Sequence, residues 1–300
     1  MRLIDEISFF LEEKGFVCSR ILRDGHEVIS TESAGNGGRR TILPLEIAAT
    51  TPETAVSAGN SAHACVMSIQ KSEGYPLIIT EDRWHLQKEM TQARLLAHLE
   101  TFTTAYARNC EVRRIEKAEA QQFLKDNHSY GYAACRYHYG LFLKRHTGHK
   151  SNDLAPGTLI AVATFSNARK WKKQDMIIRS YEWTRYASLP FLRISGGMGK
   201  ILKAFIEEVG PDDIMSYADL EWSEGDVYRQ LGFILEGHKE PVTFMVDTRT
   251  WKRFPVRPGM TGPDGSGLKE SDGSDMKEED KRFFRNFGSN KYRLKLTEYE

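Results

Sequence analysis

Three closely spaced glycines, Gly196, Gly197 and Gly199, join a predicted strand over 177–186 to a predicted helix over 200–209. A glycine turn that opens a helix gathers free backbone N–H groups at the positive end of the helix dipole. This spacing therefore predicts an anion-binding site, with phosphate as its natural ligand. The alternative is that the glycines only allow the strand and the helix to pack closely.

Composition sets the limits for the rest of the chain. Three hundred residues with a net charge of +1 predict one large or two medium globular domains. Residues 106–255 carry 23 Lys and Arg against 18 Asp and Glu, a balance compatible with a phosphate-bearing partner. The four cysteines form no Cys-x-x-Cys pair, so we expect no zinc site and no disulfide framework. We find no membrane span and no signal layout, and expect a cytoplasmic protein.

Apolar periodicity predicts the elements that position this turn. A first segment, 1–105, has helices over 3–14 and 61–72, a buried strand over 76–80 and a long helix ending near Leu99. In a second segment, 106–255, the same periodicity predicts a strand over 112–115, a helix over 117–126 and antiparallel strands over 138–144 and 158–165. The long strand, the glycine turn, the helix, a strand over 214–218 and a short helix follow, and a strand over 242–246 closes the sheet. Residues 256–279 read as a flexible linker and 280–300 as a basic-aromatic tail, which we expect to dock as a strand.

This order of elements resembles the GNAT acyltransferase fold, from Cys110 to Trp251. The most specific match is Val227-Tyr228-Arg229-Gln230-Leu231-Gly232-Phe233. The resemblance implies an α+β fold with a mixed, mostly antiparallel sheet flanked by helices. It also implies a turn that binds the pyrophosphate of an acyl coenzyme A, with one residue more after Arg193 than the family pattern has. The matching cofactor-binding positions are Arg193, Gly196, Gly197, Met198, Gly199 and Lys200, and Tyr228 corresponds to a general acid for the leaving thiolate.

A narrower resemblance is to the phage Mom-like branch, which modifies adenine in DNA. It rests on Ser216-Tyr217-Ala218-Asp219 with Gly225-x-x-Tyr228, on Asn127-His128-Ser129-Tyr130-Gly131 and on Glu182-x-x-Arg185. The resemblance implies that Asp219 or His128 takes a proton from the attacking amine. It also implies that the substrate is bound by Arg185, Glu182, Ser216, Tyr217 and Tyr130.

Each of these residues also has a structural interpretation. Asp219 could cap a helix or stabilise a turn, and His128 could be a hydrogen-bonded structural residue. Tyr228 could be a core aromatic whose hydroxyl is satisfied, and Arg185 could pair with Glu182 or Asp219.

The first segment is similar, near residues 76–113, to the last part of very-short-patch-repair-type endonuclease domains. The resemblance implies a smaller α/β domain of restriction-endonuclease type. Asp24 and Glu46 are available carboxylates, but Ala48 stands where the nuclease class has a lysine. We interpret this segment as a degenerate nuclease scaffold, more suited to binding than to cleavage.

Three functions follow from these observations. The leading one is an acyl-CoA-dependent N-acyltransferase acting on a nucleobase in DNA. A second is a catalytically inactive nucleic-acid-binding protein of phage or mobile-element origin. A third is a GNAT enzyme that acts on a protein or a small amine.

Overall fold

The computed structural model describes residues 1–32, 38–147, 153–173, 175–256 and 276–299. These residues form two compact units, each assembled from three separate segments of the chain. The first unit contains 1–100, 219–224 and 239–289, and the second contains 101–218, 225–238 and 290–300. The sequence-based division into four consecutive segments therefore differs from the compact units, and most of the predicted linker, 257–275, lies outside the described residues.

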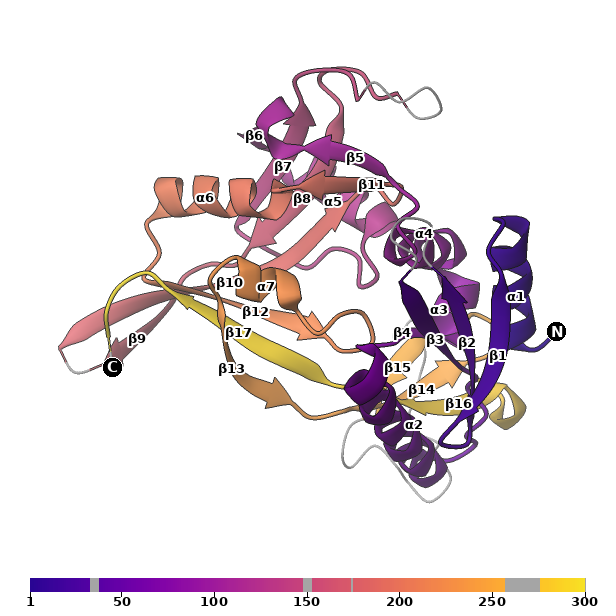
Figure 1. Cartoon of the computed structure of the whole chain (residues 1–300). Coiled ribbons are helices and arrows are strands. Elements are labelled where there is room, and N and C mark those ends of the chain that lie inside the picture. Colours follow the sequence, from indigo (N-terminus) through magenta and orange to yellow (C-terminus); the bar gives the residue numbers. More distant parts are fainter. Residues whose placement is uncertain (33–37, 148–152, 174, 257–275, 300) are drawn as a thin grey trace. The chain divides into compact units, whose positions relative to one another are not determined.

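The first unit has a mixed four-stranded sheet in the order β1-β2-β3-β4 (Figure 1). Helix α1 packs Ile7 and Leu11 into a core shared with Trp84, as its apolar spacing predicts. Thr51 caps helix α2 by accepting the Thr54 N–H, and Pro52 is at the first helical position. The elements are α1 (Leu3–Glu13), β1 (Cys18–Arg23), β2 (His26–Glu32), β3 (Arg39–Leu45), α2 (Pro52–Glu73), β4 (Leu77–Thr80), α3 (Glu81–Leu86) and α4 (Lys88–His98).

A small three-stranded sheet, β15-β14-β16, completes this unit from the other end of the sequence. Its strands are β14 (Thr243–Asp247), β15 (Arg253–Pro255) and β16 (Lys281–Arg285), with a short 3-10 helix over Glu278–Asp280. The strand predicted over 242–246 is thus real, but the prediction that it closes the long sheet is wrong. Its backbone pairs with β15 and β16 instead, a choice that local sequence does not encode.

The second unit is built on an eight-stranded sheet in the order β13-β17-β12-β10-β8-β7-β6, with β9 paired to β10 (Figure 1). Its neighbours are antiparallel from β6 to β10, and β10 is parallel to β12. The strands are β6 (Cys110–Arg114), β7 (Tyr137–Leu143), β8 (Leu159–Phe165), β9 (Arg169–Lys173), β10 (Met176–Ser188), β12 (Asp213–Asp219), β13 (Ile234–Lys239) and β17 (Ser289–Lys295). The predicted α+β class, with a mixed, mostly antiparallel sheet, is confirmed.

Helices cover both faces of this sheet. On one face, α6 (Gly197–Val209) packs Phe205 against Phe165 with the ring centroids 3.9 Å apart. On the other face, α5 (Lys117–Asn127) packs Leu124 in a cluster with Val162. The short helix α7 (Asp226–Gln230), the 3-10 helix η1 (Ala107–Asn109) and a parallel pair of β5 (Thr103–Tyr106) with β11 (Leu192–Ser195) complete the unit.

The tail residues form β16 and β17, which confirms the prediction that the tail docks as strands. Within the described ranges, no helix is both long enough and apolar enough to cross a membrane.

Candidate functional site

Two parallel strands, β10 and β12, separate from each other in the centre of the second unit's sheet and leave an opening there. Strands β10 and β12 pair over three positions, ending at Glu182 opposite Met215. Beyond that pair both strands continue, β10 to Ser188 and β12 to Asp219, without pairing to each other. Backbone N–H and C=O groups that would be hydrogen-bonded in a continuous ladder therefore face the gap between β10 and β12, which we call the wedge.

A side chain bridges the wedge near its narrow end. The Oγ of Ser216, which is only 1% exposed, lies 2.8 Å from the carbonyl oxygen of Trp183 and 2.8 Å from the hydroxyl of Tyr228. A serine hydroxyl has one proton, and a carbonyl can only accept. Ser216 therefore donates to Trp183 and accepts from Tyr228, which directs the phenol proton of Tyr228 along a defined path.

The environment of Tyr228 keeps that proton on the phenol. Burial raises the pKa of Tyr228, and the nearby carboxylate of Glu182 raises it further, against an opposing effect of the Ser216 hydrogen bond. Because phenols ordinarily titrate near pH 10, Tyr228 is neutral at physiological pH and can act as a proton donor. Its ring stacks on that of Tyr292, with centroids 5.3 Å apart.

Helix α7 reaches this position because Gly225 precedes it. Gly225 has φ +90°, and a Cβ there would lie 2.5 Å from the Tyr292 ring and 2.9 Å from Ala218. The Gly225-x-x-Tyr228 spacing is thus required by packing as well as by the placement of the hydroxyl.

Glu182 and Tyr217, both predicted substrate residues, line one cavity of about 650 Å³. They come from neighbouring strands and lie on the face of the sheet opposite α6. The volume is within the range of small-molecule sites, about 300–1,000 Å³. Its walls combine carboxylate, cationic and aromatic side chains: Ala134, Ser166, Asn167, Arg169, Trp171, Ser180, Tyr181, Met215, Lys291 and Arg293 complete them.

His128, Tyr130 and Arg185, also predicted together, form a second group in the same unit. The Nδ1 of His128 accepts the Tyr130 N–H at 3.1 Å, so a neutral His128 carries its proton on Nε2. Arg185 donates through Nε to the Gly131 carbonyl at 3.1 Å, and its guanidinium lies 5.9 Å from the Tyr130 ring centroid. These contacts hold the loop after α5 against β10, and the catalytic role of His128 stays a prediction.

The glycine turn has the backbone geometry of an anion site. Gly196 adopts φ +76° as the N-cap of α6, with no side-chain cap, and no acidic residue occupies the first turn. The first N–H groups of any helix have no partner within it. A Cβ at Gly197 would lie 3.2 Å from the Tyr186 hydroxyl of β10, so this helix end adjoins the wedge side of that strand.

The other predicted cofactor residues lie around this turn in different settings. The Nζ of Lys200 donates to the carbonyls of Ala107 and Cys110 at 2.8 and 2.5 Å. The guanidinium of Arg193 lies 5.1 Å from the Phe102 ring centroid, and Met198 packs against the core beneath the sheet. Lys200 thus already stabilises the backbone around the start of β6, and its role toward a cofactor stays a prediction.

Asp219 belongs to the first unit and is engaged there. Its Oδ2 accepts from Nη2 of Arg83 at 3.1 Å, and its Oδ1 accepts the Glu221 N–H at 3.0 Å. These bonds engage both carboxylate oxygens, the atoms that would have to accept a proton from an amine. The structural interpretation, in which Asp219 stabilises the turn after β12, accounts for these bonds.

Sequence reasoning missed two groups at this unit's surface and core. His138 on β7 is 6% exposed, and its Nε2 lies 3.1 Å from the Tyr132 hydroxyl, while burial lowers its pKa. Arg169 and Trp171 of β9 line the cavity with Glu182. The nearly continuous apolar and aromatic run of β7 could have indicated a buried His138, and the cationic run of β9 was a visible signal.

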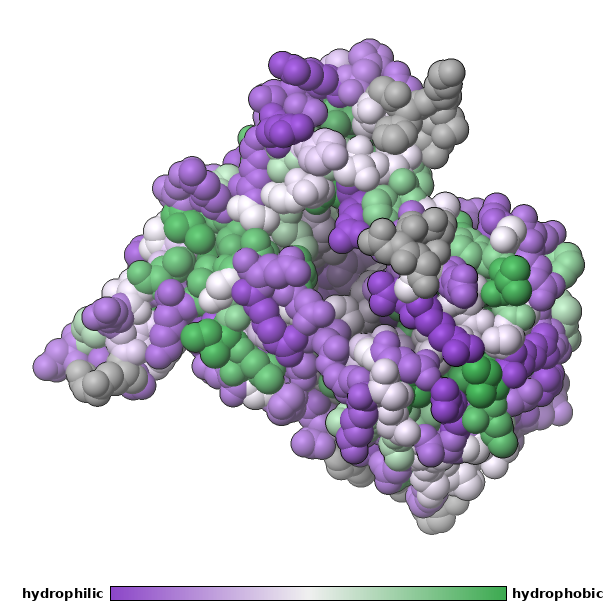
Figure 2. Space-filling model, in the orientation of Figure 1, coloured by the Kyte–Doolittle hydropathy of each residue, from purple (hydrophilic) through white to green (hydrophobic). Residues whose placement is uncertain are grey.

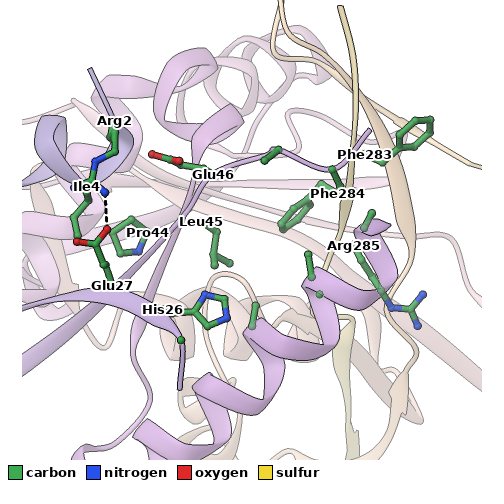
Figure 3. Close-up of a pocket in the computed structure, with 17 residues that line it drawn as sticks. Arg2, Ile4, His26, Glu27, Pro44, Leu45, Glu46, Phe283, Phe284 and Arg285 are labelled. Atoms are coloured by element: carbon green, nitrogen blue, oxygen red, sulfur yellow. Dashed lines mark hydrogen bonds and ion pairs between the residues drawn. The ribbon is translucent and has the colours of Figure 1, made fainter. Parts of the chain in front are cut away.

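The first unit has a cleft of its own, of about 320 Å³ (Figure 3). Small residues of α2, Leu45 and Phe284 form its apolar lining, and His26, Glu46 and the Arg2–Glu27 ion pair lie at its margins. Glu46 accepts the Leu3 N–H at 3.1 Å, and Ala48 lines the cleft where the nuclease class would have a lysine. Within the described part of the chain, no three His, Cys, Asp or Glu side chains are grouped closely enough to hold a metal.

No protein-family model matches this sequence, and no curated protein matches it either. Among solved structures, Eis1 of Mycobacterium abscessus is similar over 50% of this chain, with 18% identity and a TM-score of 0.32. This chain covers 36% of the length of Eis1.

Two further structures are similar over more of their length. YncA of Salmonella typhimurium, described as an acetyltransferase with its cofactor acetyl-CoA, matches 64% of this chain and 96% of its own at 14% identity and a TM-score of 0.34. A GNAT-family acetyltransferase of Bacillus anthracis matches 62% of this chain and 95% of its own at 11% identity and a TM-score of 0.30. Likenesses at these scores do not establish a family for this chain.

Proposed function

We propose that the second unit is an acyl-CoA-dependent N-acyltransferase of the GNAT type. The presence of three features in this one unit carries the proposal: a parallel-strand wedge, an uncapped helix N-terminus and a half-buried, proton-bearing tyrosine. From β6 to α7, this unit also contains, in order, the elements that the sequence resemblance implies.

The residues present fit an acyl coenzyme A. The uncapped first turn of α6 offers N–H groups and the positive end of a dipole to a pyrophosphate. Gly199 allows α6 to pack closely against the end of α7, because a Cβ at this position would lie 3.2 Å from Leu231, the residue that follows α7. When bound, an acyl coenzyme A supplies an activated thioester carbonyl.

The chain's own groups handle the protons. Tyr228 holds a proton on its hydroxyl at the wedge and donates it to Ser216 in this structure. Rotation about the phenol C–O bond turns the same proton toward a leaving thiolate, which takes it and leaves a phenolate beside Ser216. Glu182 lines the cavity on the neighbouring strand and can take the proton of an attacking amine. This assignment favours Glu182 over the ion-paired Asp219 as base.

The anion site is tested by a charge placed beside it. Ser195 is exposed and precedes Gly196, so Ser195→Asp puts a carboxylate at the N-terminus of α6. We expect acetyl-CoA affinity, measured by isothermal titration calorimetry, to fall about tenfold or more, because the carboxylate repels the pyrophosphate. The same change should leave the melting temperature unchanged or raise it, since acidic residues stabilise helix N-termini.

The matched control is Ser195→Asn, which keeps the shape without the charge. Its affinity should stay within about twofold of the unaltered chain. A chain that binds no acetyl-CoA, or two variants that bind equally, contradicts the proposal.

We further propose that the acceptor is the exocyclic amine of a nucleobase in DNA. The cavity that holds Glu182 also presents the aromatic rings of Trp171 and Tyr217 and the charge of Arg169, which suit a planar base attached to phosphate. Support comes as well from the matched Ser216-Tyr217-Ala218-Asp219 and His128-containing motifs.

Mass spectrometry of nucleosides tests the acceptor. DNA from cells that express the protein is digested and compared with DNA from cells that express Glu182→Gln. We expect an acylated or otherwise enlarged nucleoside only with the unaltered chain. Identical nucleoside profiles, combined with intact acetyl-CoA binding, would instead favour a protein or small-molecule amine as acceptor.

A further inference from the structure

Strand β9 is the most strongly cationic element of the second unit. Four of its five residues, Arg169, Lys170, Lys172 and Lys173, carry positive charge around Trp171. Together with the first part of β10 it forms an antiparallel hairpin that extends to the free end drawn at the lower left of Figure 1. Figure 2 shows mainly hydrophilic residues at that end.

The four charges are not neutralised within the described part of the chain. No ion pair found among the described residues involves any of them, whereas Arg179 on the same hairpin pairs with Asp212. Lys291 and Arg293 of β17 also have a carboxylate partner, Glu236. Like charges at this density repel one another, so an external polyanion would relieve a cost that the fold itself leaves uncompensated.

The charges point to both faces of the hairpin. Two residues directly opposite each other in a hairpin lie on the same face, and successive pairs alternate between the two faces. The pairs Lys172–Ile177 and Lys170–Arg179 thus share one face. The pairs Lys173–Met176 and Arg169–Ser180 share the other. Lys170 and Lys172 therefore lie on one face, and Arg169 and Lys173 on the other. A flat anionic surface, such as a membrane, can contact only one face of a ribbon at a time.

We propose that the paired strand segments 169–173 and 176–179 form a nucleic-acid-binding ribbon that enters a groove of double-stranded DNA. The walls of a groove carry phosphates on both sides, and the major groove is wide enough for a two-stranded ribbon. Lys170 and Lys172 contact one wall, and Arg169 and Lys173 contact the other. These are phosphate contacts, so binding by the ribbon is independent of sequence.

Apolar side chains near the end of the hairpin fit the same partner. Ile177 is 67% exposed and Met176 is 43% exposed, although each is large and apolar. In the major groove, apolar side chains can contact the methyl groups of thymine.

The ribbon is continuous with the cavity already described. Arg169 and Trp171 line the cavity together with Glu182, so DNA held along the ribbon brings its bases to that opening. The biological meaning of DNA binding by the ribbon rests on the proposed function, in which the acceptor is a nucleobase of that DNA. The binding itself is measured without acyl transfer.

Fluorescence anisotropy with a labelled duplex of about 20 base pairs tests the ribbon, using the full chain at several NaCl concentrations. Two variants remove one face each: Lys170→Ala with Lys172→Ala, and Arg169→Ala with Lys173→Ala. Each lost phosphate contact should reduce the slope of log affinity against log salt by about 0.9, hence by about 1.8 for each double variant. We expect each to weaken binding about tenfold or more at constant salt.

The control is Lys125→Ala with Lys203→Ala, which removes two exposed charges from α5 and α6 of the same unit and should change affinity less than about threefold. Far-UV circular dichroism confirms that every variant is folded. Ribbon variants that match the control overturn the inference. So does dependence on one face only, accompanied by binding to vesicles of anionic phospholipid. Acetyl-CoA affinity of the variant Lys170→Ala with Lys172→Ala, whose two residues do not line the cavity, should be unchanged and reports separately on the proposed function.

Discussion

At the scale of single residues, the environment decides which of several plausible groups can move a proton. Tyr228 is half-buried, hydrogen-bonded to Ser216 and close to the negative charge of Glu182, so its proton is retained on the phenol. Asp219, by contrast, already accepts from Arg83 and from a backbone N–H. By residue type alone, Tyr228 and Asp219 were equally good candidates for proton transfer.

Replacing Tyr228 by Phe removes the proton donor and keeps the ring. We expect acyl transfer, measured as modified nucleoside in the DNA assay, to fall about 100-fold or more, the usual contribution of a general acid. Acetyl-CoA affinity should change little, because the ring still packs on Tyr292.

Ser216→Ala is the companion variant, since it releases the Tyr228 hydroxyl without removing it. An intermediate loss of transfer is expected. Full activity in Tyr228→Phe would exclude Tyr228 as the acid.

At the scale of elements, glycines set how closely neighbouring segments approach. Gly225 has a positive φ and is enclosed by Ala218 and the Tyr292 ring. Gly237 on β13 lacks a positive φ, and a Cβ added there would meet no atom of the described residues within 4 Å. The two glycines lie in the same unit, so they form a matched pair for the effect of an added methyl group.

Gly225→Ala should therefore destabilise the chain by about 1–3 kcal/mol, through overpacking and the unfavourable φ. Gly237→Ala should change the free energy of unfolding by less than about 0.5 kcal/mol. Urea denaturation followed by tryptophan fluorescence measures both. Equal effects would show that packing around α7 is looser than the distances indicate.

At the scale of the whole molecule, the first unit depends on residues that are far apart in the sequence. Glu221, 1% exposed, accepts from Arg83 at 3.0 Å and from Arg253 at 2.8 Å, and Arg253 also pairs with Asp82. Three distant stretches of the chain are thus joined through one buried carboxylate. Removing one partner from such a group leaves the others buried and uncompensated.

The pH dependence of stability follows from this group. Burial alone would raise the pKa of Glu221, but Arg253 and Arg83 lower it to about 2, below the ordinary value of 4.5. A lowered pKa in the folded state stabilises the protein above the unfolded value, and that stabilisation is lost as the pH falls from about 4.5 to about 2. Glu221→Gln should lower the free energy of unfolding at pH 7 by about 3–5 kcal/mol.

The same variant should lose less stability than the unaltered chain between pH 4.5 and pH 2, because it has no proton to take up at this position. Urea denaturation at several pH values measures both effects. Glu53→Gln, at an exposed position on α2, serves as the control and should stay within about 0.5 kcal/mol. Parallel pH curves for Glu221→Gln and the unaltered chain would contradict this account.

The sequence by itself determined the central elements of the second unit and their order, whereas the strands β5, β9, β11 and β13 were not predicted. The antiparallel strands near 138–144 and 158–165, the long strand, the glycine turn and the helix after it are all present, because each depends on local periodicity and on glycine. The motifs also named Glu182, Tyr217, Ser216, Tyr228, His128 and Arg185 as members of one site, and their roles stay predictions.

Tertiary structure alone decided the rest. It assigned residues 239–289 to the first unit and placed β17 between β12 and β13. It also paired Asp219 with Arg83, which lies 136 positions earlier in the chain. It also brought the cationic strand β9 beside the cavity that holds Glu182. Strand partners and buried ion pairs form between residues that no local pattern connects, so their choice depends on which distant surfaces pack together.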